Sequence, residues 1–479
     1  MPTGALNTHD GCVTCRCCCK ELHATAGLGA VSEVFAALKS PSILGGNSAV
    51  AGGEGFSYWA AEPREVFEFA SEQQAPFDKL RERLGRYRIA EELPCQVPKG
   101  LLRGGWIGYI AYELGRYIER LPQTTVDDLA LPLIRLCFYD RLLAYDHRRG
   151  MFWAVALSLP DDAEPLEEKI IGLERLLDAA RGCDPPQPRA ADIERVDLAK
   201  AVGNMTHKDY LSAVERTKRY IRDGDIYQVN LSQRFERPFA GRPIDLFAWQ
   251  NRFNPSPYPA YIDLGDRQIV SASPEMFITI RDGRILTKPI KGTRPRLDPF
   301  DHASEAMNAS NFEELRTNEK ERAELNMIVD LERNDIARIC IPGTRRVVQP
   351  RTIETYPTVF HAVATVAGRL RPEIDFTEAL KAVFPGGSIT GAPKIRAMEI
   401  IDELEPTARG VYTGSIGYIG LDGTACLNIA IRTIIIASGK AFVQSGGGIV
   451  ADSSPEAEWE ETLTKVRALL AGIEAVQSR

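Results

Sequence analysis

A carboxylate and an amine flank one predicted β-hairpin. Glu275 precedes a run of strand formers, and Lys291 follows the second apolar run. The dipeptide Asp282-Gly283 between the two runs is a strong turn signal. Residues equally far from a hairpin turn lie opposite each other, so we expect both side chains at the open end of the ribbon.

A Glu and a Lys that face one cavity can supply a general acid or base beside an amine nucleophile. Spacing alone favours an exposed cross-strand salt bridge between Glu275 and Lys291, which would contribute little to folding stability. The rigid Pro-Ile-Lys-Gly-Thr corner around the lysine shifts the balance towards a reactive site.

Two predicted helices carry glutamates at helical spacing. In KERAELNMIVDLERNDIAR, Glu321 and Glu324 lie three residues apart and share a face. In the last helix, Glu458, Glu461 and Lys465 share a face. Each face taken alone is more often solvated than functional. Four glutamates converging from the two helices would instead offer the hard oxygen ligands that Mg2+ prefers.

Two glycine-rich segments could cradle an anion. FPGGSITGAPK, residues 384–394, leads into a helix whose N-terminus presents free N–H groups and the positive end of the dipole. In GGGIVADS, Gly446 to Gly448 would let backbone amides approach a carboxylate. Considered alone, the first segment is more often a flexible linker and helix cap.

Two further residues are polar but lie within apolar stretches of the sequence. Arg432 lies in a predicted strand at 427–436, where an unpaired buried charge would be costly. It must therefore meet an internal acid or a ligand carboxylate. His361, in TVFHAVATV, is by itself typical of a packed core histidine.

The elements around these residues mix helices, strands and hairpins without a steady strand-helix rhythm. This pattern favours an α+β fold, with a large two-layer β-sandwich-like core flanked by helices, over a doubly wound parallel sheet. We expect a disordered Cys-rich tail at 1–30, an N-terminal region at 31–182, a proline-rich linker at 183–204 and a catalytic region at 205–479. The polar segment 294–320 predicts a loop, either over the site or passive on the surface.

Composition excludes several classes of protein. The 479 residues are 44% hydrophobic and 26% charged, as in ordinary globular proteins. A net charge of -7 argues against a general nucleic-acid binder. No apolar run of about 20 residues predicts a membrane span. The N-terminus lacks the pattern of a signal peptide, so we expect a cytoplasmic protein.

Five of the ten cysteines cluster between Cys12 and Cys19. Cys12-x-x-Cys15 could form half of a zinc site, but no matching pair follows at finger-like spacing. We therefore favour a flexible extension over a metal or redox role for this cluster.

Six blocks of sequence occur in an order that resembles the chorismate-utilising enzymes: SASPEMF, PIKGTRPR, DLERNDIAR, FPGGSITGAPKIRAMEIIDELEP, GSIGYIG and GGGIVADS. The resemblance covers roughly residues 31–473 and implies the chorismate-binding fold. Lysine at the third position of PIKGT resembles aminodeoxychorismate synthase component I, whereas anthranilate synthase component I usually carries alanine there.

The resemblance also implies roles for individual residues. Lys291 and Glu275 would be catalytic, with His361 near the substrate ring. Glu324 and Glu461 would bind Mg2+, with Glu321 and Glu458 supporting it through water. The implied substrate-binding residues are Thr390, Gly391, Tyr412, Arg432, Gly446, Gly447 and Gly448, assisted by Lys465.

Gln228 is a further implied substrate-site residue. Relatives that add water to chorismate carry a lysine at the matching position as the water-activating base. Glutamine cannot abstract a proton at neutral pH, so Gln228 disfavours isochorismate or salicylate chemistry.

The activity implied is the Mg2+-dependent conversion of chorismate and ammonia to 4-amino-4-deoxychorismate, on the p-aminobenzoate branch towards folate. The ammonia would come from a separate glutamine amidotransferase subunit. One alternative is anthranilate synthase component I, which forms anthranilate and pyruvate. Another is a catalytically idle relative that serves as a metal- or partner-binding module.

Overall fold

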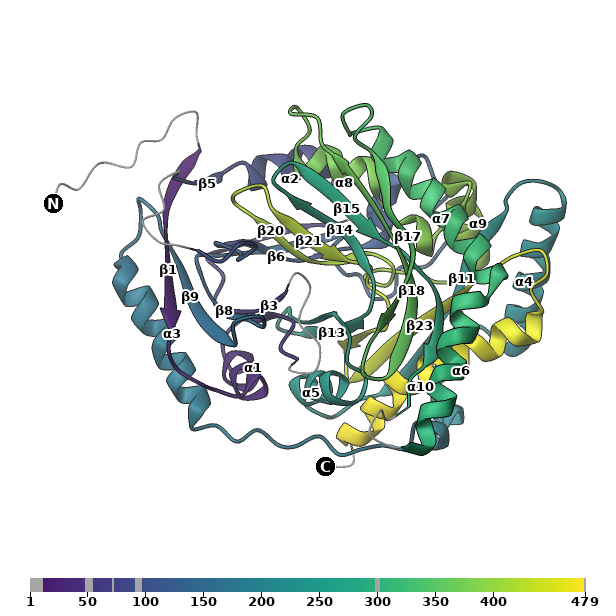
Figure 1. Ribbon diagram of the computed structural model, residues 1–479, viewed down its shortest axis with the longest axis horizontal. Helices are drawn as coiled ribbons and strands as arrows, with labels where there is room; N and C mark the ends of the chain where they lie inside the picture. The colour runs from purple at the N-terminus through teal and green to yellow at the C-terminus, as the bar shows by residue number, and fades with distance from the viewer. Residues whose placement is uncertain (1–11, 48–54, 71–72, 91–96, 298–301, 478–479) are drawn as a thin grey trace.

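Two large β-sheets carry the fold, and helices lie against their outer faces (Figure 1). The computed structural model describes residues 12–47, 55–70, 73–90, 97–297 and 302–477. Strand pairs are antiparallel throughout the described sheets, except where β1 runs parallel to β5. The α+β prediction, with two sheets flanked by helices, is confirmed.

The first sheet has 13 strands. Their order is β10 (Val202–Gly203), β11 (Gln228–Pro238), β23 (Lys440–Ile449), β22 (Thr433–Ala437), β13 (Arg267–Ser273), β12 (Tyr258–Asp263), β2 (Ser42–Leu44), β3 (Phe56–Ala60), β8 (Arg141–Asp146), β9 (Met151–Ser158), β1 (Val13–Leu22) and β5 (Tyr87–Ile89), with β19 (Gly391–Ala392) paired to β11.

The second sheet has ten strands. Their order is β16 (Ile290–Pro295), β18 (Val359–Arg369), β15 (Arg284–Lys288), β14 (Met276–Arg281), β21 (Ala425–Asn428), β20 (Ser415–Gly420), β6 (Gly105–Ile110), β7 (Ile134–Tyr139) and β4 (Glu65–Phe69), with β17 (Arg346–Thr355) paired to β18.

The helices are of two kinds. The α-helices are α1 (Leu28–Ala36), α2 (Pro76–Leu84), α3 (Leu166–Arg181), α4 (His207–Arg222), α5 (Pro243–Phe253), α6 (His302–Thr317), α7 (Glu319–Ala337), α8 (Phe376–Val383), α9 (Lys394–Leu404) and α10 (Pro455–Gln477). Short 3-10 helices span Tyr112–Tyr117, Ile193–Arg195, Leu198–Lys200 and Gly387–Ile389. No helix in the described ranges is both long enough and apolar enough to cross a bilayer.

The main hydrophobic core lies between the two sheets. Tyr58 of β3 packs edge-on against Tyr418 of β20, with ring centroids 5.5 Å apart. A second core joins the outer face of the 13-stranded sheet to α1, α3, α5 and α10. Alternate side chains of a strand point to opposite faces, so strands buried on both faces, such as FSYWA in β3, read as continuous apolar runs.

The prediction that the Cys-rich N-terminal segment is disordered is wrong for the residues that the structure describes, which start at Cys12. Residues 13–22 form β1, which pairs with β9 and β5. Cys15, Cys17 and Cys19 alternate inward into the core between the sheets. Thiols pack as small apolar groups, so the strand buries the face that carries these cysteines, while Arg16 and Lys20 project from the opposite face. Residues 1–11 lie outside the described part.

The predicted boundaries at 31–182 and 205–479 do not separate structural units. Strand β2 pairs with β12, and β6 pairs with β20, so both regions contribute to both sheets. Segment 183–204 is anchored, since the Trp249 indole N–H donates to the Arg189 carbonyl at 2.9 Å. The loop predicted at 294–320 is also wrong, because α6 occupies 302–317.

Candidate active site

The predicted hairpin is present and brings Glu275 and Lys291 together. Strand β14 starts directly after Glu275 and pairs with β15, with Met276 opposite Lys288. A short corner then leads into β16, where the Ile290 N–H donates to a Glu275 carboxylate oxygen at 3.5 Å. This contact holds the carboxyl beside the residue that precedes Lys291, close enough for their charges to affect each other.

Glu275 is a buried acid, with only 4% of its surface exposed. Burial raises its pKa to about 7, against the opposing influence of the nearby Ser388 hydroxyl and of Lys291. Loss of water disfavours the charged carboxylate. Near neutral pH, Glu275 can therefore carry the proton that a general acid needs.

Lys291 occupies the centre of the site. Burial lowers its pKa, and Lys465 acts in the same direction, while Glu324, Glu275 and Glu461 act against them. The net direction is downward, so desolvation outweighs the surrounding acids. The sequence alone left this balance open.

The lysine amine points at the glycine strand. A Cβ atom built on Gly448 would lie 3.2 Å from Lys291 Nζ and 2.6 Å from Gln228 Nε2. Only glycine leaves room for these two side chains to converge on β23. Gln228 is fully buried, and neither polar atom of its amide has a hydrogen-bond partner in the described structure. Its donor and acceptor are both available to a ligand.

The four predicted glutamates gather around this lysine. Glu324 and Glu461 both act electrostatically on Lys291. On the same helices, Glu321 lies near Glu324, and Glu458 lies near Glu461. Glu458 Oε2 would lie 2.8 Å from a Cβ on Gly447, and Glu461 Oε1 would lie 3.7 Å from it. The acids of α7 and α10 therefore converge.

Other side chains already engage three of these acids. Glu321 accepts from Arg294 at 2.8 Å, and Glu458 accepts from the Ser453 hydroxyl at 2.6 Å. Glu461 pairs with Lys465 at 2.7 Å. Lys465 also donates to the Gly446 carbonyl at 2.9 Å.

The described residues contain no group of three or more His, Cys, Asp or Glu side chains arranged to enclose a metal ion. Mg2+ does not require such a cage, because it keeps several waters and uses one or two carboxylates. Glu324 and Glu461 meet that smaller requirement. The donor set therefore fits Mg2+ better than a metal that needs four protein ligands.

The glycine-rich segment 384–394 is fastened to β11 beside Gln228. Gly391 pairs with Val229, and the Asn230 N–H donates to the Thr390 carbonyl at 2.8 Å. Gly391 has φ +150°, and a Cβ there would lie 2.2 Å from the Gln228 carbonyl. The Thr390 hydroxyl is buried and donates to the Gly386 carbonyl at 2.9 Å.

Arg432 and His361 lie close together on another side of the site. Arg432 lies between β21 and β22 with φ 49°, and no ion pair links it to an acid in the described part of the chain. Burial lowers its pKa. His361 is 1% exposed, and burial together with Arg432 lowers its pKa to about 3, so the imidazole is neutral. Its Nδ1 lies 2.8 Å from the Thr293 hydroxyl.

Tyr412 lies under a buried arginine that sequence reasoning missed. The Arg409 guanidinium is 5.9 Å from the Tyr412 ring and pairs with Glu405 at 2.6 Å. It also donates to the carbonyls of Ile389 and Asn230 at 3.0 and 2.7 Å. These bonds tie the glycine-rich segment to β11. The Glu-Arg spacing of four residues in the sequence was the available signal.

Glu332 is a second buried acid that sequence reasoning missed. It is 8% exposed and accepts from the Thr287 hydroxyl of β15 at 2.9 Å. Burial and the proximity of Glu275 raise its pKa well above the usual value. One helical turn later, Asp335 pairs with Lys394 at 2.7 Å. The DLERND block held both acids at a spacing of three, which was the available signal.

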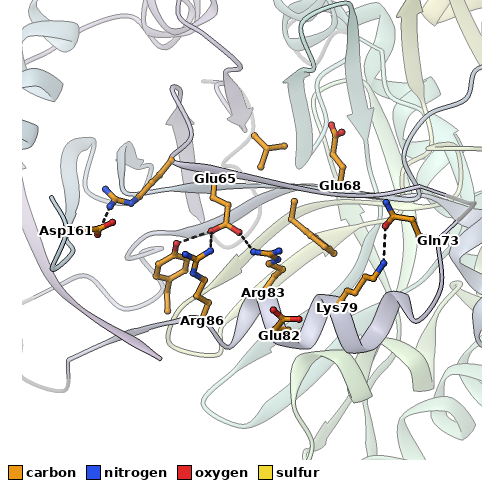
Figure 2. Close-up of a pocket in the computed structure, with 12 residues that line it drawn as sticks. Glu65, Glu68, Gln73, Lys79, Glu82, Arg83, Arg86 and Asp161 are labelled. Atoms are coloured by element: carbon orange, nitrogen blue, oxygen red, sulfur yellow. Dashed lines mark hydrogen bonds and ion pairs between the residues drawn. The ribbon is translucent and has the colours of Figure 1, made fainter. Parts of the chain in front are cut away.

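A large surface cavity lies away from this cluster, between β4, α2 and β5 (Figure 2). Its volume is about 800 Å³. None of the predicted site residues lines it, and its central acid, Glu65, already pairs with Arg83 and Arg86 at 3.1 Å. We assign the chemistry to the region around Lys291, where buried groups are unpaired and have shifted pKa values.

Comparisons with known proteins identify relatives of this chain. Anthranilate synthase component 1 of Thermus thermophilus is 41% identical over 407 residues, which cover 85% of this chain and 84% of that protein. Aminodeoxychorismate synthase component 1 of Bacillus subtilis is 40% identical over 372 residues, which cover 78% and 77%.

The crystal structure of anthranilate synthase component I from Streptococcus pneumoniae matches with a TM-score of 0.75 at 32% identity, over 87% of this chain and 92% of that one. A family model described as chorismate binding enzyme matches residues 48–471. The chain therefore belongs to the chorismate-binding enzyme family.

Proposed function

We propose that this protein is aminodeoxychorismate synthase component I, which converts chorismate and ammonia to 4-amino-4-deoxychorismate. The observation that carries the proposal is the position of Lys291. Its amine converges with Gln228 on Gly448, beside the buried acid Glu275. A lysine in such a position serves as a nucleophile rather than as a solvated cation.

The proposed reaction has two displacements. The neutral Lys291 amine forms a bond to ring C2 while the ring double bond shifts and the C4 hydroxyl leaves. Glu275 donates a proton to that hydroxyl, which departs as water. Ammonia then forms a bond to C4, the double bond returns, and the C2–Nζ bond breaks to release the neutral Lys291 amine. The new C4 ammonium returns one proton to the Glu275 carboxylate, which restores the acid. The second displacement restores the free lysine, and water is the only by-product.

The remaining residues bind and orient the substrate in this proposal. Arg432, which pairs with no acid among the described residues, would bind one chorismate carboxylate through charge-assisted hydrogen bonds. The amides of Gly446 to Gly448 approach the other carboxylate, with Lys465 beside them. Neutral His361 lies against the substrate ring, while Tyr412 and Thr390 line its far side.

Mg2+ belongs to the same proposal. Glu324 and Glu461 would hold it, and Glu321 and Glu458 would support it through water. When bound, the ion would neutralise the ring carboxylate of chorismate and fix the substrate's position. Glu324 and Glu461 come from α7 and α10, so binding would also fasten these two helices to each other.

A second subunit would supply the ammonia. Similar proteins are component 1 of two-component synthases. We therefore propose a separate glutamine amidotransferase subunit as the partner of this chain. Ammonium salts should replace that subunit in the assay, because free ammonia can serve as the nucleophile directly.

Anthranilate synthase component I is the second candidate, because relatives of that kind are about as similar to this chain. That enzyme aminates ring C2 and eliminates pyruvate. In the proposed mechanism, Lys291 occupies C2 itself. The amine should therefore exclude ammonia from C2 and direct it to C4.

Product analysis tests the proposal. Chorismate, Mg2+ and ammonium are incubated with the wild type, Lys291→Ala and Lys288→Ala. Lys288 is a matched control three residues away whose amine already pairs with Glu354. We expect aminodeoxychorismate from the wild type and Lys288→Ala, and none from Lys291→Ala. Anthranilate and pyruvate from the wild type would overturn the assignment. Full activity of Lys291→Ala would rule out Lys291 as the nucleophile, and no turnover by the wild type would favour the idle relative.

A further inference from the structure

The cysteine cluster of β1 places two thiols against each other. Cys17 and Cys19 are two residues apart in the strand, so their side chains project from the same face into the core between the sheets. Their sulfur atoms are 3.7 Å apart, and the two residues are 7% and 6% exposed. Cys18 projects from the opposite face, towards the core that contains α3.

The two thiols contact each other, and the Cys17 sulfur also lies 3.8 Å from the Arg103 carbonyl oxygen. One thiol donates a hydrogen bond to the other, which lowers the pKa of Cys19 and raises that of Cys17. Burial also raises the pKa of Cys17, against a smaller opposing influence of the Arg103 guanidinium. Arg103 also pairs with Asp422 at 2.8 Å, which fixes the guanidinium in place.

We propose that Cys17 and Cys19 form a two-thiolate site for a soft monovalent metal ion of the Cu(I) class. Metal–sulfur bonds are about 2.3 Å long, so two sulfurs 3.7 Å apart can both reach one ion with little movement of the strand. Thiolates are the ligands that select Cu(I) over harder ions. The bound complex carries one negative charge, which Arg103 offsets.

Two alternative roles of the Cys17–Cys19 pair, a zinc site and a disulfide, fit the structure less well. A structural zinc site needs four protein ligands, and the described residues include no group of even three suitable side chains. A disulfide would join residues i and i+2 of one strand, whose Cα atoms are about 6.6–6.8 Å apart. That separation lies at the upper limit for a disulfide, so closure would distort β1.

An ion can reach the pair through the edge of the sheet. Strand β5 covers β1 only from Val13 to Cys15, and from Arg16 to Leu22 the strand pairs with β9 alone in the described sheet. Local opening of an edge strand costs less than global unfolding. Binding releases the thiol protons to solvent, so affinity should fall as pH falls.

The test is a Cu(I) titration of the reduced full-length chain, in competition with a chromogenic Cu(I) chelator. The variants are Cys17→Ser/Cys19→Ser and the matched control Cys18→Ser, with thermal unfolding to verify that each is folded. We expect the double variant to bind one equivalent fewer than both the wild type and Cys18→Ser. X-ray absorption of the wild-type complex should show two sulfur ligands.

Equal stoichiometry in all three proteins would overturn the proposal. It would also fail if air oxidation removed two hydrogens by mass from the wild type but not from the double variant, since that result identifies a disulfide. If the double variant does not fold, Cys19→Ser alone replaces it, because one sulfur cannot form the two-coordinate site. None of these outcomes depends on the chorismate chemistry.

Discussion

Burial shifts the pKa values of Glu275 and Lys291 in opposite directions within one site. It raises the pKa of the Glu275 carboxyl to about 7 and lowers the pKa of the Lys291 amine. Both shifts favour the uncharged form, which is the form each group needs in the proposed reaction. The acid and the nucleophile are thus prepared by the same loss of water.

The alkaline side of the pH–rate profile should reflect the deprotonation of the Glu275 carboxyl. Its protonated form is lost as pH rises through about 7, so kcat/KM should fall on that side. Glu275→Gln should lose roughly 100- to 10,000-fold in kcat, the usual contribution of a general acid, and the residual rate should lack this fall. The measurement is kcat/KM against pH at constant free ammonia. An alkaline fall retained in Glu275→Gln would assign it to another group.

Removing a carboxylate from the proposed Mg2+ site should weaken the ion's binding. Glu324→Gln and Glu461→Gln should each raise the Mg2+ concentration for half-maximal activity at least about tenfold, because even indirect contacts to a metal have effects of that size. Glu460→Gln is the control, since Glu460 is exposed on the same helix. If all three variants respond to Mg2+ alike, these glutamates do not hold the ion.

A methyl group at Gly391 should detach the glycine-rich segment from β11. The new Cβ would lie 2.2 Å from the Gln228 carbonyl, and φ at this position is +150°. Gly391→Ala should cost roughly 1–3 kcal/mol of unfolding free energy and most of the activity. Gly172→Ala in α3 is the control, because nothing lies within 4 Å of its Cβ. Denaturant unfolding and chorismate turnover measure both effects, and unchanged turnover in Gly391→Ala would contradict the model of the site.

Glu332 should make folding stability depend on pH. Its pKa is raised in the folded state above the ordinary value of 4.5, so the folded state binds more protons. The stability it contributes is present below pH 4.5 and is lost as pH rises towards the folded-state pKa, by about 1.4 kcal/mol per pH unit. Glu332→Gln should therefore raise Tm at pH 8 and leave it unchanged at pH 4.

The control for that variant is Asp330→Asn, on the same helix but exposed and paired with Arg333. It should change Tm little at either pH. Equal Tm values for wild type and Glu332→Gln at pH 8 would mean that the pKa of Glu332 is not raised in the folded protein. The hydrogen bond from Thr287 can persist in the variant, because an amide oxygen also accepts.

Several predictions failed where local sequence signals conflict with packing. Helix α6 covers 302–317, but its sequence is polar with little apolar periodicity, so it was predicted to be a loop. The segment that forms strand β1 was predicted to be a tail, because its clustered cysteines lack a matching metal-ligand pair at finger-like spacing. In the fold, these thiols cover the edge of an apolar core, and only the neighbouring strand β9 shows that the core is there.

The sequence by itself determined the hairpin, the helices that carry the glutamates and the glycine-rich segment, because turn residues and periodicity act over short distances. It also predicted that Glu275 and Lys291 meet at the open end of that hairpin, although their spacing alone favoured an exposed salt bridge. Only the tertiary structure decided that burial outweighs the acids around Lys291, that Glu332 lies near Glu275, and that Arg409 joins the glycine-rich segment to β11. Desolvation and charge depend on every segment packed around a group, and those segments lie far apart in the chain.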